Sequence, residues 1–276
     1  MTDKRRQKIR NDRAVSEAIG FILVFGIIIA GIGLVTMYAY PMLLQQQSSS
    51  NEQIMEKNMI VLQNDLKSLA YKTVPYSETS LSVGGGALTA YNMTYSTSDA
   101  YFSIFDSNKP PIIANELNPL TFYPGDLSYE STDAQTRLSL ENGAVVKMML
   151  AENGSTMLAE PRWYYDSQTN SAVIYLIGFN TSTNDVMGLE GVGTVRMALV
   201  QTNYTLYNLP ANDPVYVTYK PNGTADYSAA WDNYFTGTLE MQPTAVPGEY
   251  ILPTTSQPNQ PARVVIYTYE IMIESV

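Results

Sequence analysis

The sequence predicts an α+β protein, in which a long N-terminal transmembrane helix precedes an all-β antiparallel sandwich (Ig-like or jelly-roll-like). Two observations support this prediction. Residues 18–40 form an uncharged apolar stretch of 23 residues. After residue 74 the chain consists of short β-type runs separated by turn residues, without a second helical run. We therefore expect four segments: a basic leader at 1–14, a transmembrane helix at 15–44, a helical stalk at 45–73 and an extracellular β-rich domain at 74–276.

The apolar stretch 18–40 is long enough to cross a bilayer, since an α-helix of this length spans roughly 35 Å against about 30 Å of hydrocarbon. The leader carries six Lys or Arg residues and two Asp residues, so the positive-inside rule keeps the N-terminus in the cytoplasm and places the C-terminal domain outside. A buried core helix and a cleaved secretory signal are the alternatives. They fit less well because the stretch has no polar face and is followed by no convincing small-x-small cleavage site. Pro41 is expected to kink the helix or to end it at Tyr40.

The stalk carries one apolar stripe with spacings of 4, 3, 4 and 3 residues, which lies on one face of a helix. Two partners for this stripe remain open, the protein's own β-domain and the helices of other subunits. The stripe consists of Met55, Met59, Leu62, Leu66 and Leu69.

The β-rich region has one clear hairpin signal and one clear central strand. The hairpin joins 135–140 to 144–150 around Asn142-Gly143, a dipeptide typical of two-residue β-turns. In 263–273 both alternating sets of side chains are largely apolar, so this strand is expected inside a sheet. The glycines at 84–86 are expected to form a turn or a bulge between two strands.

Composition excludes several classes of function. The chain has no Cys and no His, so it offers no disulfide, no usual catalytic triad and few zinc ligands. We expect no enzyme activity, no cofactor and no metal site. From residue 51 onward there are 10 Lys or Arg against 23 Asp or Glu. This acidic balance argues against nucleic acid and anionic lipid as partners of the outer region.

The junction of leader and span reads RAVSEAIGFILVFGIIIAG from residue 13. It resembles the processing site and core helix of archaeal type IV pilin-like proteins, the class III signal peptide group. The resemblance implies cleavage by the archaeal prepilin peptidase, with Arg13 as the basic position, Ala14 as the small one and Val15 as the new N-terminus. Glu17-Ala18 stands where many of these proteins have Pro-Val. Together with ENGAVVK and EPRWYYD, this is similar to a poorly characterised archaeal pilin-like group.

Two residues near the new N-terminus are expected to act in helix register and assembly. Glu17 would be the third residue of the processed chain, where it pairs with the α-amino group of a neighbouring subunit or stays solvated at the cytoplasmic interface. Gly20 belongs to the Val-Ser–Ile-Gly frame of the resemblance. Removing the basic leader leaves the apolar helix attached, as filament formation in this family requires.

Five Asn-x-Ser/Thr sequons lie on the outer side and are candidate N-glycosylation sites. Turn formation is the alternative role for those followed by glycine. The aromatic residues at 163–165 and around Trp231 are interpreted as core packing rather than as glycan-binding platforms. The sequons begin at Asn92, Asn153, Asn180, Asn203 and Asn222.

The resulting hypothesis is a single-pass surface protein of the cell membrane. It would serve as a pilin-like subunit of a type IV pilus-like assembly, with a structural or adhesive role. Its expected partners are the membrane, itself or related pilin-like subunits, and the prepilin peptidase, with no nucleic acid. The alternative is a permanently anchored ectodomain that binds an extracellular ligand or partner protein. A carbohydrate-active enzyme would need two carboxylates that converge in a cleft.

Overall fold

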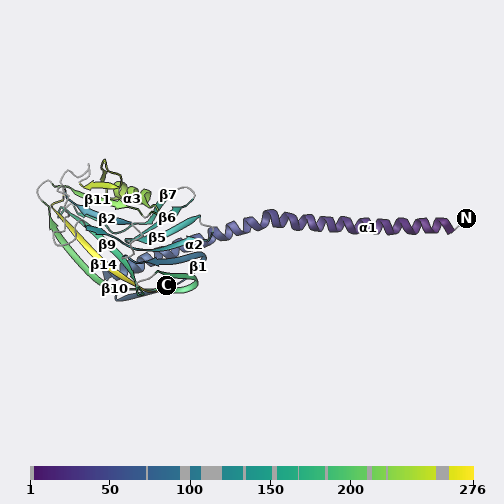
Figure 1. Ribbon diagram of the computed structural model, residues 1–276, viewed down its shortest axis with the longest axis horizontal. Coiled ribbons are helices and arrows are strands. Elements are labelled where there is room, and N and C mark those ends of the chain that lie inside the picture. The colour runs from purple at the N-terminus through teal and green to yellow at the C-terminus, as the bar shows by residue number, and fades with distance from the viewer. Residues whose placement is uncertain are drawn as a thin grey trace. The chain divides into compact units, whose positions relative to one another are not determined.

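The structure is a computed structural model of the 276-residue chain (Figure 1). It describes residues 3–72, 74–93, 100–106, 120–132, 135–150, 154–166, 168–183, 186–209, 213–221, 223–252 and 261–276. The chain divides into two compact units, Met1–Ser50 and Asn51–Val276.

Helical structure runs from the leader to residue 72 in three consecutive segments. These are α1 (Asp3–Leu34), the π-helical turn η1 (Val35–Ala39) and α2 (Tyr40–Lys72). One of our two expectations was that the helix ends at Tyr40. This is wrong, because α2 continues to Lys72. Pro41 lacks an N–H group and its ring crowds the preceding turn, and a π turn placed just before a proline offers a wider turn at that point.

The second unit contains a nine-stranded sheet (sheet A), a five-stranded sheet (sheet B) and a short helix. Sheet A has the order β7-β6-β5-β4-β1-β10-β14-β9-β8, and sheet B has the order β12-β13-β11-β2-β3. The elements are β1 (Tyr76–Tyr91), β2 (Tyr101–Phe105), β3 (Leu120–Phe122), β4 (Asp126–Ser131), β5 (Thr136–Glu141), β6 (Ala144–Met149), β7 (Gly154–Ala159), β8 (Tyr164–Asp166), β9 (Ser171–Thr181), β10 (Met187–Asn208), β11 (Val215–Lys220), α3 (Ser228–Asn233), the π turn η2 (Tyr234–Thr238), β12 (Gln242–Pro243), β13 (Glu249–Leu252) and β14 (Arg263–Ser275).

The predominantly β character and the antiparallel pairing are confirmed, with one exception. Strands β9 and β14 pair in parallel, from Arg263 opposite Ser171 to Ile273 opposite Thr181. The central place of β14 is confirmed, since it lies between β10 and β9 (Figure 1). The hairpin of β5 and β6 is also confirmed. Its turn residues Asn142 and Gly143 both have positive φ, which is the geometry of a type I′ turn.

The three glycines at 84–86 do not separate two strands, because β1 continues through them. Val83 pairs with Gly191 and Leu88 with Leu189, so four residues of β1 form a bulge opposite a single residue of β10. Gly85 has φ +65°, and a Cβ at Gly86 would lie 2.2 Å from a backbone oxygen of β4. The bulge reading of this segment is therefore the one the fold adopts.

The C-terminal part of α2 belongs to the core of the second unit. All five stripe residues, Met55 to Leu69, are fully buried within one hydrophobic cluster with strand residues. The chain's own strands are thus the partner of the stripe. This differs from the expected stalk at 45–73, since the second unit begins at Asn51 rather than at residue 74.

Other elements pack on both faces of sheet A, although much of β10 stays exposed. Lys147 of β6 contacts Glu56 of α2, and Tyr71 of α2 packs on Tyr175 of β9. On the opposite face, Glu141 of β5 accepts a hydrogen bond from Trp231 of α3. Sheet B packs beside α3 through contacts of Phe102 with Trp231. The order of layers is therefore α2, sheet A, then sheet B with α3.

Candidate functional site

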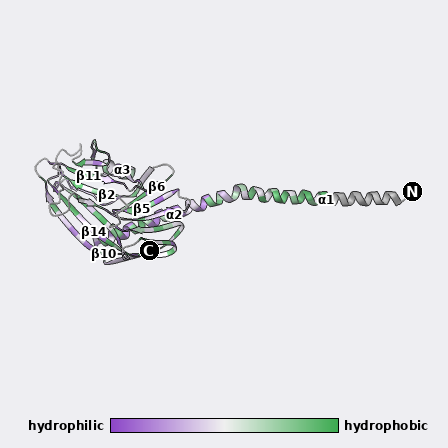
Figure 2. Ribbon diagram, viewed as in Figure 1, coloured by the Kyte–Doolittle hydropathy of each residue, from purple (hydrophilic) through white to green (hydrophobic). Residues whose placement is uncertain are grey.

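The first functional feature is an apolar helical surface that the described chain leaves uncovered. Among the described residues, one helical run is long and apolar enough to cross a membrane, and its apolar window is not buried at all. Large side chains from Ile19 to Leu44 are exposed, for example Phe21 at 71% and Met37 at 70% (Figure 2, hydrophobic residues in green). Exposed apolar surface on this scale indicates contact with lipid or with other helices.

The residues expected at the processing site lie within α1. Arg13, Ala14, Val15 and Glu17 continue the same helix that carries the apolar surface. Gly20 lies on this helix too, and a Cβ placed on it would meet no atom within 4 Å. Packing within the described chain therefore does not require glycine at this position.

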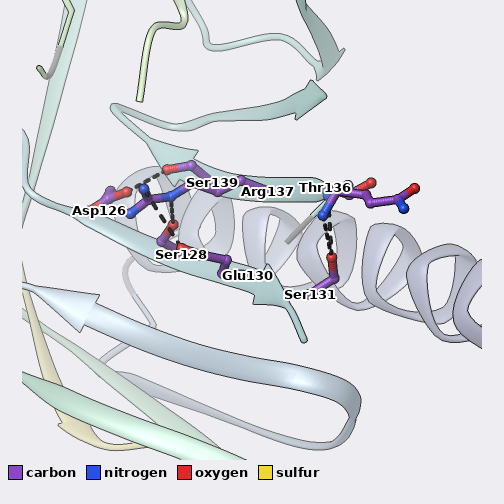
Figure 3. Close-up of polar contacts among 8 residues, drawn as sticks. Asp126, Ser128, Glu130, Ser131, Thr136, Arg137 and Ser139 are labelled. Carbon is purple, nitrogen blue, oxygen red and sulfur yellow. Dashed lines mark hydrogen bonds and ion pairs between the residues drawn. The ribbon is translucent and has the colours of Figure 1, made fainter. Parts of the chain in front are cut away.

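The second feature is a buried polar cluster between sheet A and α3, which sequence reasoning did not anticipate. In β5 the side chains alternate, so Leu138 and Leu140 share one face while Arg137, Ser139 and Glu141 share the other. Asp126 on β4 accepts a hydrogen bond from Ser139 Oγ at 2.8 Å, and Arg137 Nε donates to Ser128 Oγ at 2.9 Å (Figure 3).

The two carboxyl groups of this cluster have perturbed acidities. Glu141 is 2% exposed, and Trp231 Nε1 donates to its Oε1 at 3.0 Å. Burial, followed by the nearby charge of Asp126, raises the pKa of Glu141 to about 8. Burial also raises the pKa of Asp126, against the opposing effect of its hydrogen bond from Ser139. The arrangement keeps Glu141 protonated at neutral pH.

The cavity beside these carboxyl groups limits what they can do. Its volume is about 10 Å³, close to the space that one water molecule occupies. A sugar ring cannot enter it, so the pair does not form the cleft that glycoside hydrolysis requires. Within the described residues no group of three acidic side chains offers a metal site. The cavity is lined by Ala100, Pro124, Gly125, Asp126, Glu141, Ala225 and Tyr227.

The core interpretation of the aromatic runs is confirmed for both tryptophans. Trp163 is 5% exposed and Trp231 is fully buried. The ring centroids of Trp231 and Phe102 are 4.7 Å apart, in an edge-to-face arrangement. Tyr164 is the exception in these runs, because 42% of it is exposed. The rings around Trp231 join α3 to sheet B and do not form a platform for a glycan.

The sequons differ in how accessible their asparagines are. Asn92 is 3% exposed, and the side-chain amide of Asn180 donates to Glu270. Asn203 on β10 is exposed. Asn153 and Asn222 lie outside the described residues. Because a glycosyl transferase must reach the amide nitrogen, Asn203 is the sequon best presented among those described.

Comparisons with known proteins give one finding. Neither the curated proteins nor the solved structures contain a match to this chain. A model of DUF7289, a family of unknown function, matches residues 13–274. This match covers both the apolar helix and the second unit. The chain therefore belongs to the DUF7289 family.

Proposed function

We propose that this protein is a membrane-anchored archaeal surface protein and a pilin-like subunit of a type IV pilus-like assembly, with a structural or adhesive role. The carrying observation is the uncovered apolar surface from Ile19 to Leu44, which continues as one helical run into the core of the second unit. A helix that is apolar on all sides needs lipid or other helices around it. The basic leader and the motif at Arg13 support the same proposal.

In the membrane, the apolar part of the helix spans the hydrocarbon core, with the leader in the cytoplasm and the second unit outside. The six positive charges of the leader set this orientation. The finer expectation of an Ig-like or jelly-roll-like sandwich stays part of the proposal. The packing of sheets A and B against each other supports this expectation. A sandwich of two sheets alone does not account for α2, which covers the face of sheet A that does not meet sheet B.

Processing before Val15 would change the energetics of the helix. It removes the six charges that hold the N-terminus on the cytoplasmic side, because moving charged side chains through the bilayer is costly. The helix is then free to leave the bilayer outward and to pack among copies of itself. Small residues on its surface, such as Gly20 and Gly26, permit close approach of neighbouring helices.

Mass spectrometry of the native N-terminus in isolated membranes tests the proposal. We expect the mature chain to begin at Val15. In an Ala14→Glu variant, which removes the small residue from the motif, we expect the leader to stay attached. Gln7→Glu is the matched control, because it adds the same charge within the leader but outside the motif. An intact leader on the unmodified protein would instead indicate the permanently anchored ectodomain.

A further inference from the structure

Strand β10 has a long edge without a neighbour among the described strands. Its first half pairs with β1, ending at Ala198 opposite Tyr76. Pro75 O then accepts a hydrogen bond from Leu199 N at 3.4 Å. From residue 200 to residue 208 the strand pairs on one side only, with β14. The described part of the chain places nothing against the other side.

The direction of the backbone groups on this edge follows from one hydrogen bond. Leu209 N donates to Ala262 O at 3.0 Å, on the β14 side. Backbone groups of successive residues in a strand point to opposite sides. Those of residues 203, 205 and 207 therefore face β14, and those of residues 202, 204, 206 and 208 face the open side. The irregularity at Val200 precedes residues 202–208, so it does not change the directions of their backbone groups.

The open edge lacks two features that usually prevent strand pairing, charged side chains and proline. Residues 197–212 contain no charged side chain, and residues 199–208 contain no proline. The segment is rich in Thr, Tyr and Leu, which favour β-structure. Its side chains are exposed, with Tyr204 at 72% and Leu206 at 50%. Natural proteins usually protect an edge strand by keeping it short, by placing charges or a bulge on it, or by covering it with another element.

We propose that the β10 edge pairs in antiparallel orientation with the β10 edge of a second copy of this chain. The two-fold axis passes through Thr205, so that Thr205 faces its own counterpart, Tyr204 faces Leu206, and Thr202 faces Asn208. In this register the residues with open backbone groups face one another and exchange hydrogen bonds. The exposed Tyr204 and Leu206 become aromatic–aliphatic pairs on one face. The interface is isologous, as two-fold dimers require.

A second copy is the partner because the edge is complementary to itself: it is uncharged, and in this register its open backbone groups and its exposed Tyr204 and Leu206 meet their own counterparts. The region from residue 51 onward has 13 more acidic than basic side chains, so two copies repel each other. The uncharged edge adds no charge to that repulsion. A β-pair at this edge would join the two copies of sheet A into one sheet. The pairing does not depend on leader processing, so it stands or fails separately from the proposed filament role.

A single cysteine tests the register, because the chain has no native cysteine. The Thr205 pair is of the non-hydrogen-bonded type, with Cα atoms about 4.5 Å apart, which suits a disulfide. The experiment uses the full chain without glycans in detergent under mild oxidation. We expect Thr205→Cys to give disulfide-linked dimer in at least about tenfold excess over Val192→Cys, since proximity sets the rate. Val192 is 81% exposed and keeps the same apolar helix, so it controls for association through that helix.

A second variant separates pairing from folding. Leu206→Lys in the Thr205→Cys background places a charge on the edge, but leaves the bonds to β14 intact because the backbone groups of residue 206 face outward. We expect its cross-linking to fall to the Val192→Cys level, with unchanged tryptophan fluorescence. Thr205→Cys dimer no more abundant than the control would overturn the proposal. Dimer that persists with Leu206→Lys would also overturn it.

Discussion

Two apolar helical segments of this chain, 18–40 and 51–72, have opposite environments. The first is apolar on all sides, and its large side chains are more than half exposed from Ile19 to Phe25. The second is apolar along one stripe, and that stripe is fully buried. Both segments are helical, although the first includes the π turn η1. The width of the apolar surface therefore decides whether a helix packs on its own chain or needs partners outside it.

Polar contacts add to the difference between the two segments. Gln63 lies on the buried side of α2, and its amide donates to Gly143 O at 2.7 Å and to Glu160 O at 3.0 Å. These bonds satisfy a polar group that burial would otherwise leave unpaired. The segment 18–40 has one internal bond of this kind, from Thr36 Oγ1 to Ile32 O. The bonds of Gln63 fix the second segment to its own unit.

The largest expected effect comes from removing volume from the buried stripe. Leu62→Ala should lower the free energy of unfolding of the second unit by about 2–5 kcal/mol, because it leaves a cavity in a close-packed core. Denaturant unfolding of the full chain in detergent, followed by tryptophan fluorescence, measures this, since both tryptophans lie in the second unit. Ile28→Ala is the matched control and should leave the transition unchanged. Equal destabilisation by both variants would contradict the comparison.

The next effect concerns the opposite face of sheet A and depends on pH. Because the pKa of Glu141 is raised from 4.5 to about 8 in the folded state, the folded state holds its proton more tightly than the unfolded state. Stability from this group is complete below pH 4.5 and is lost as the pH rises to about 8. Glu141→Gln should therefore raise the free energy of unfolding at pH 8 by about 1–3 kcal/mol and flatten its pH dependence.

Unfolding curves from pH 5 to pH 8 measure this change, with the exposed Glu190→Gln as the control. The glutamine oxygen can still accept the Trp231 hydrogen bond, so packing is preserved. A variant with the same pH slope as the unmodified protein would show that Glu141 is not the group responsible. The helix α2 lies on the other face, so this result does not depend on it.

The smallest effect concerns the ion pairs at the start of the buried segment. Lys147 Nζ lies 2.7 Å from Glu56 Oε1 and 3.8 Å from Glu52 Oε2, and all three side chains are partly buried. Lys147→Met should cost about 1 kcal/mol, because it removes the pairing but keeps most of the aliphatic packing. The denaturation midpoint measures this, and the loss should shrink in high salt. Arg196→Met removes the ion pairs with both Glu78 and Glu274 and should still cost less, because these side chains are more exposed and their pairing is screened by solvent.

Local pattern was enough to predict much of the fold. The type I′ hairpin at Asn142-Gly143 and the apolar character of β14 are encoded within a few residues, and both are confirmed. The parallel pairing of β9 with β14 joins segments about 90 residues apart, and no local signal reports such a pairing. The helix α3 was not predicted because it has only six residues, too few for a periodic pattern, and because it is held in place by the buried Trp231.

The polar cluster could not be predicted for a similar reason. Asp126 and Glu141 lie 15 positions apart, and each resembles an ordinary strand-end carboxylate. Only the pairing of β4 with β5 and the cover provided by α3 bring them to one cavity. The spacing of the stripe did predict a buried helical face, but its partner was left open because the sheet that receives it forms from distant segments.

The position of β14 has a consequence for folding. This strand separates β10 from β9, so sheet A cannot be completed until residues 263–275 have been synthesised. Until then β9 and β10 lack a shared neighbour, and the pairings that join them span a long stretch of sequence, which slows folding. An inner strand of sheet A is therefore the last of the described strands to be added.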